Sequence, residues 1–116
     1  MKATIYHNPR CSKSRDALQM LKDRHIEVEI IQYLKHPPSE QELGELLVGL
    51  GMEPRELMRR KEKPYKAKGL DNQDLDRASL IRAMVEDPIL IERPIVLIGD
   101  KAVLGRPLDK VAEILG

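Results

Sequence analysis

Aromatic residues are scarce in this 116-residue chain, which contains no Trp, no Phe and only three Tyr. The hydrophobic core must therefore be built from aliphatic side chains and Met. Proteins that bind single-stranded nucleic acid commonly stack bases on aromatic rings, and this chain offers few. An excess of charge is lacking too, since 20 basic and 19 acidic residues leave a formal net charge of +1. We therefore expect no direct binding to nucleic acid or to a membrane surface.

A second cysteine is also lacking. Because Cys11 is the only one, the chain has no internal disulfide, no Cys-x-x-Cys pair and no multi-cysteine metal site. We expect no bound metal and no bound cofactor, and a redox cycle at Cys11 would need a thiol from another molecule. The sequence shows neither a run of eighteen apolar residues nor a leader-like segment. These absences favour a cytoplasmic protein outside the membrane.

The length fits one compact domain over residues 1–116, and we expect a monomer. The first part of the chain predicts a strand over 2–6 and a turn that contains Pro9. A helix is predicted over about 12–23, and a strand over 27–31. The opening therefore has the order strand, turn, helix, strand.

A helical insertion is predicted over about residues 39–87. Signals for the starts of three helices occur at Ser39, Pro54 and Asp76. The polar stretch 61–74 between them predicts a loop. Strands at 95–98 and 102–104 and a helix that starts at Pro107 complete the chain. This order predicts an α/β fold with a mixed four-stranded sheet flanked by helices and a helical insertion between strands 2 and 3.

Cys11 falls between the first strand and the first helix. At a helix start, unpaired backbone amides and the helix dipole favour a thiolate and also a bound oxyanion. Arg10, Lys13 and Arg15 make this turn basic, although the whole chain is nearly neutral. We therefore predict a lowered pKa for the Cys11 thiol.

Two other interpretations of Cys11 are open. A lone cysteine is often a buried and inert core residue, but the position after a strand and among cations favours a reactive one. A cysteine phosphatase loop needs an Arg six residues after its nucleophile. Here that position is Ala17, and Arg15 comes too early in the chain to serve. A phosphatase is therefore the weaker alternative.

The segment HNPRCSKSR, residues 7–15, resembles the active-site turn of the ArsC family, which comprises thioredoxin-like arsenate reductases that use glutathione and glutaredoxin. Further segments match that family in order and extend the resemblance over essentially the whole chain. They are Gln32-Tyr33-Leu34 with Pro37-Pro38, Leu57-Met58-Arg59 with Pro64-Tyr65, Pro88 to Pro94, and Gly105-Arg106-Pro107. The resemblance implies a thioredoxin-like fold.

The resemblance also implies the site. Cys11 would be the catalytic nucleophile, and Arg59, Arg93 and Arg106 would bind the oxyanion and stabilise the thiolate. Guanidinium groups suit that task because they donate paired, charge-assisted hydrogen bonds. Any of them could instead be a solvated surface residue, and only the spacing to Pro64-Tyr65 selects Arg59 over Arg60.

Four supporting residues are assigned around Cys11. Pro94 matches the cis-proline that lies beside the reactive cysteine in thioredoxin folds, and Arg15 adds positive charge to the turn. His7 could help to hold the thiolate, and Ser14 could donate a hydrogen bond to it. His7 and Ser14 could equally be local turn or capping residues.

The implied function is reduction of arsenate to arsenite, with glutathione as co-substrate and glutaredoxin as partner. Arg10, Ser12 and Lys13 replace the small residues that the best-known arsenate reductases carry around the cysteine, so the substrate is less certain than the site. Two alternatives stay open. One is an Spx-type regulator that binds RNA polymerase, although Ser14 occupies the position of its second switch cysteine. The other is a monothiol, glutathione-dependent oxidoreductase.

Overall fold

A computed structural model describes residues 2–105 and 108–115. The chain divides into two compact units. We call Met1–His36 with Arg93–Gly116 the sheet unit, and Pro37–Glu92 the helical unit. The sheet unit is thus assembled from both ends of the sequence.

The sheet unit contains a four-stranded mixed sheet with the order β2-β1-β3-β4. Its strands are β1 (Lys2–Tyr6), β2 (Glu27–Ile31), β3 (Ile95–Ile98) and β4 (Lys101–Leu104). β1 pairs with β2 in parallel, whereas β1 with β3 and β3 with β4 are antiparallel. The parallel pair needs a crossover, which α1 (Ser12–Asp23) supplies. The predicted α/β fold with a mixed four-stranded sheet is confirmed.

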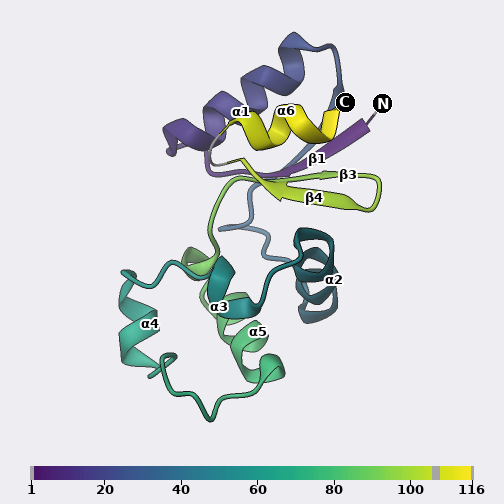
Figure 1. Cartoon of the computed structure of the whole chain (residues 1–116). Helices are drawn as coiled ribbons and strands as arrows, with labels where there is room; N and C mark the ends of the chain where they lie inside the picture. Colours follow the sequence, from purple (N-terminus) through teal and green to yellow (C-terminus); the bar gives the residue numbers. More distant parts are fainter. Residues whose placement is uncertain (1, 106–107, 116) are drawn as a thin grey trace. The chain divides into compact units, whose positions relative to one another are not determined.

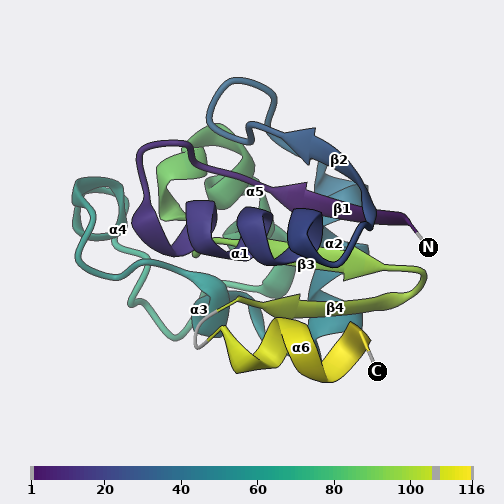
Figure 2. The same cartoon turned by 90° about the horizontal axis from the view of Figure 1, so that it is seen from above.

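Two helices cover one face of this sheet. Figures 1 and 2 show α1 and α6 (Asp109–Leu115) on the same side of the strands. Alternation along β1 turns Ala3 and Ile5 into the core, where they meet residues of both helices and of β3. The fully enclosed members of this core are Ala3, Ile5, Ala17, Leu21, Val96 and Val111. The core is aliphatic, as the composition requires.

The helical unit consists of short helices with well-defined ends. They are α2 (Glu40–Leu50), α3 (Pro54–Leu57), α4 (Lys63–Ala67), α5 (Arg77–Glu86) and a 3-10 turn at Pro88–Leu90. Ser39 and Glu42 form a reciprocal capping box at the start of α2, and Gly51 ends that helix with a φ of 65°. Asp76 caps α5 through a hydrogen bond from the Ser79 amide.

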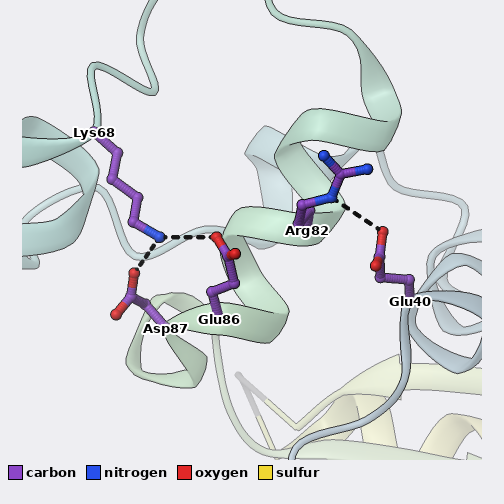
Figure 3. Close-up of polar contacts among 5 residues, drawn as sticks. All are labelled: Glu40, Lys68, Arg82, Glu86 and Asp87. Carbon is purple, nitrogen blue, oxygen red and sulfur yellow. Dashed lines mark hydrogen bonds and ion pairs between the residues drawn. The ribbon is translucent and has the colours of Figure 1, made fainter.

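α5 is the central helix of this unit, because it contacts α2, α3 and the 3-10 turn. The Leu80, Ile81 and Met84 side chains of α5 are buried. Figure 3 shows three polar contacts at its surface and its C-terminal end. Arg82 Nε lies 3.7 Å from Glu40 Oε1 of α2, and Lys68 Nζ contacts Glu86 at 3.2 Å and Asp87 at 2.6 Å. Burial of its apolar side chains and ion pairs at its surface therefore both hold α5 in place.

The prediction of a loop over 61–74 is wrong in part, because α4 occupies Lys63–Ala67. α4 buries none of its residues, so it produces no apolar stripe in the sequence. The signal that could have found it is Pro64 in the first turn. The predicted helix start at Pro107 lies outside the described residues. Among the described helices, none combines the length and the apolar character needed to span a membrane.

Candidate active site around Cys11

The turn between β1 and α1 presents Cys11 at the start of the helix. Pro9 cannot continue the strand, and the Cys11 amide donates to the Asn8 carbonyl oxygen at 3.0 Å. The Arg10 amide donates to Asn8 Oδ1, also at 3.0 Å. Cys11 itself is the N-cap residue of α1, with extended backbone angles, and its carbonyl accepts from the Arg15 amide at 3.0 Å. This turn therefore places the sulfur at the end of the helix where backbone amides have no helical partner.

The pKa of the Cys11 thiol is lowered from its ordinary value. Partial burial on its own raises this pKa, because burial disfavours the charged form. The backbone amides of Ser14 and Lys13 and the charge and side-chain hydrogen bonding of Arg93 favour the thiolate and outweigh that effect. The side chain is of intermediate exposure. The structure therefore has the features of a reactive cysteine rather than an inert core residue.

His7 and Ser14 form a buried pair beneath this turn. His7 Nδ1 lies 2.7 Å from Ser14 Oγ, which also accepts from the Asn8 amide at 3.0 Å. Burial lowers the pKa of His7, and the nearby positive charges of Arg15 and Lys22 lower it further. The tautomer of the His7 ring decides whether Nδ1 donates to the Ser14 hydroxyl or accepts from it, because a hydroxyl can do both. The described hydrogen bonds of Ser14 Oγ thus run to His7 and Asn8 and hold the shape of the turn.

Arg15 extends from the first turn of α1 back over the same segment. Its Nη1 donates to the Pro9 carbonyl oxygen at 2.9 Å, and the side chain is exposed. This bond joins the two ends of the turn. Arg15 therefore contributes a hydrogen bond across the turn as well as positive charge.

Arg93 and Pro94 lead into β3 and complete the site within the sheet unit. The Arg93–Pro94 peptide bond is cis. The Pro94 carbonyl accepts from the Gly105 amide at 2.9 Å. A Cβ atom on Gly105 would lie only 2.8 Å from Pro94 Cγ and 3.3 Å from Val111 Cγ2. Glycine is therefore the residue that fits this close approach of β4 to Pro94.

Arg59 belongs to the helical unit and has carboxylate partners there. Its Nη2 lies 3.1 Å from Glu62 Oε1, and its Nε lies 3.9 Å from Glu92 Oε1. Arg60 is exposed. Arg106 lies outside the described residues. Of the predicted neighbours in the sheet unit, Ser14 and Arg93 interact with the Cys11 sulfur. The described contacts of His7, Arg15 and Pro94 are with Ser14, Pro9 and Gly105.

Some features of the site were not predicted from the sequence. The contact of Gly105 with Pro94 depends on strand pairing, which the residue types alone do not specify. Glu62, the nearer carboxylate on Arg59, lies in a polar stretch where each charge has several potential partners. Within residues 2–105 and 108–115, no group of three or more His, Cys, Asp or Glu side chains is placed to hold a metal ion.

The fold and this turn define a class of protein: a thioredoxin-like α/β domain with one activated cysteine at a helix start. The chain belongs to the ArsC family, whose family model matches residues 6–114. It is 48% identical over 112 residues to a protein of Neisseria meningitidis serogroup A named arsenate reductase, a match that covers 96% of each chain. It is 50% identical over 113 residues to the Escherichia coli K12 protein YfgD, covering 97% of this chain and 95% of YfgD.

The fold has a close structural match. The arsenate reductase from Vibrio cholerae superposes with a TM-score of 0.95 at 46% identity, and the match covers 98% of both chains. The resemblance found in the sequence is thereby confirmed at the level of family and fold.

Proposed function

We propose that this protein is an arsenate reductase that uses Cys11 as its nucleophile. The observation that carries the proposal is the position of Cys11 as the N-cap residue of α1, where the Ser14 and Lys13 amides and Arg93 favour its thiolate. The names of its relatives indicate the substrate, because proteins 48% and 46% identical are called arsenate reductase. The same turn in a protein without such relatives would define only a reactive thiol.

In the proposed reaction, the Cys11 thiolate attacks arsenic and an arsenate oxygen leaves as water, which forms a sulfur–arsenic bond. Glutathione then replaces a second oxygen of this adduct, which leaves as water. The glutaredoxin thiolate attacks the glutathione sulfur, and water cleaves the bond between arsenic and Cys11 to regenerate the thiol. Arsenic gains two electrons and is released as arsenite, while the two external thiols are oxidised to a mixed disulfide. Cys11 is the only cysteine in the chain, so both electrons come from outside. Glutathione acts as a co-substrate, and no bound cofactor takes part.

Arg59, Arg93 and Arg106 are the proposed oxyanion ligands. Each guanidinium can donate two parallel N–H bonds to oxygens of the anion, which a Lys ammonium does less well. Arg93 would act on both the anion and the thiolate. This double role explains why we expect its loss to be more damaging than the loss of an arginine that binds the anion alone. We further propose that the protein acts as a monomer in the cytoplasm.

The proposal is tested by arsenite production with glutathione and glutaredoxin, comparing the wild type with Cys11→Ser and Arg93→Ala. We expect turnover by the wild type, none by Cys11→Ser and a large loss in Arg93→Ala. Omission of either thiol component should also stop turnover. Arsenite formation by Cys11→Ser at the wild-type rate would refute the proposal. If the wild type reduces a glutathione mixed disulfide but not arsenate, the monothiol oxidoreductase is the correct assignment.

A further inference from the structure

The guanidinium of Arg59 is held by two carboxylates in the helical unit. Glu62 Oε1 lies 3.1 Å from Nη2 and Glu92 Oε1 lies 3.9 Å from Nε. All three side chains are about three-quarters buried, with exposures of 25% for Arg59, 26% for Glu62 and 27% for Glu92. Ion pairs between side chains buried to this extent are less screened by solvent than an ordinary surface ion pair.

The backbone fixes both carboxylates beside Arg59. The Glu62 amide donates to the Arg59 carbonyl at 3.2 Å, so Glu62 lies one turn further along the chain. On the other side, Met58 and Ile91 form an antiparallel bridge. The bridge is flanked by bonds from the Arg59 amide to Leu90 O at 2.7 Å and from the Glu92 amide to Leu57 O at 2.8 Å. The backbone hydrogen bonds thus fix Arg59 and its two acidic partners next to one another.

The described ion pair of Glu62 is with Arg59, three residues before it, and not with the exposed Lys61 or Lys63 that adjoin it in the chain. The guanidinium and its two carboxylates together carry a net charge of −1. A bound oxyanion would need the same N–H donors that these carboxylates use. An arriving anion must therefore compete with Glu62 for Arg59.

We propose that Glu62 is an internal competitor of the substrate, whose carboxylate occupies Arg59 until an oxyanion displaces it. This inference rests on the proposed function, in which Arg59 is an oxyanion ligand. An arriving oxyanion displaces Glu62 rather than Glu92. The Glu62 carboxylate is the one nearer to the Arg59 guanidinium and so occupies its N–H donors, whereas Glu92 is also held by a further interaction. Glu62 thereby sets the affinity of the site. It also favours anions that carry enough charge to break the pair.

The test is Glu62→Gln, which keeps the shape of the side chain and removes its charge. We expect the KM for arsenate to fall about two- to fivefold, the ratio that corresponds to the free energy of a partly exposed ion pair. In an Arg59→Ala background, Glu62→Gln should not change the KM. The matched control is Glu86→Gln, which makes the same charge change in the same unit at a carboxylate that pairs with Lys68 (Figure 3). We expect that control to keep the wild-type KM.

An unchanged or higher KM in Glu62→Gln, with wild-type thermal stability, would overturn the inference. So would an equal fall in KM in the Arg59→Ala background or in Glu86→Gln. A readout without turnover separates this inference from the proposed function: calorimetric titration of arsenate into Cys11→Ser with and without Glu62→Gln. Tighter binding to the double variant supports the role of Glu62 even if the wild type makes no arsenite. Equal affinity, or no binding to either protein, overturns it.

Discussion

The charge state of Cys11 depends on groups from two distant parts of the sequence. The amides of Lys13 and Ser14 follow it directly in α1, whereas Arg93 precedes β3. The amides are present in any helix that starts at this residue, so they could be predicted from the strand–turn–helix pattern. The contribution of Arg93 could be predicted only from the family resemblance, because it depends on how β1 and β3 pair.

We predict that Arg93→Gln raises the pKa of Cys11, because it removes a positive charge and a hydrogen-bond donor that favour the thiolate. The sign is fixed by the chemistry: the folded-state pKa is lowered, so the wild-type thiolate persists to lower pH than an ordinary thiol. The rate of alkylation of Cys11 by iodoacetamide, measured against pH, reports this midpoint. The midpoint should lie below that of free cysteine in the wild type and should move up in the variant.

The control is Arg24→Gln, which removes an exposed arginine at the other end of α1. Its alkylation midpoint should match the wild type. Equal midpoints for Arg93→Gln and the wild type would mean that the amides of α1 alone activate the thiol.

Elements with a periodic apolar pattern or a capping residue could be predicted closely. The strand over 27–31 and the helix over 12–23 occur as β2 and α1. The Ser39 and Asp76 caps start α2 and α5. α4 could not be found in this way because none of its residues is buried. For the same physical reason, the pairing of Arg59 with Glu62 was not predictable, since polar side chains in a polar stretch leave no periodic signal.

At the end of β4, Gly105 provides a test of packing against the reactive turn. A methyl group there would lie 2.8 Å from Pro94 Cγ and 3.4 Å from Ala17 Cβ. We predict that Gly105→Ala lowers the free energy of unfolding by about 1–3 kcal/mol, the usual cost of overpacking a core. Urea denaturation of the purified variant measures this change.

The matched control is Gly44→Ala in α2, where a Cβ would meet Ile81 Cδ1 at an ordinary 3.9 Å. Alanine is a better helix former than glycine, so this variant should be more stable by about 0.5–1 kcal/mol. A Gly105→Ala protein as stable as the wild type would show that β4 and Pro94 can separate without cost.

On the scale of the whole molecule, the sheet unit depends on its second segment. β3 pairs with β1 at residues Thr4 to Tyr6 and carries the core residue Val96, and α6 adds Val111. We predict that a chain ending at Glu92 does not form the sheet, because β1 and β2 alone are a two-strand ribbon that has lost Val96 and Val111 from its core. Amide hydrogen exchange should show protection of Ala3 and Ile5 in the full chain and its loss in the truncated one. Retained protection of β1 would contradict the prediction.

The two-segment construction of the sheet unit has a consequence for the newly made protein. Cys11 leaves the ribosome well before Arg93 and its strand, because synthesis proceeds from the N-terminal side of the chain. Until then the sulfur lacks the guanidinium that favours its ionised form. The sulfur is therefore fully activated only when the second segment joins the sheet, and before that it has at most the contribution of the α1 amides.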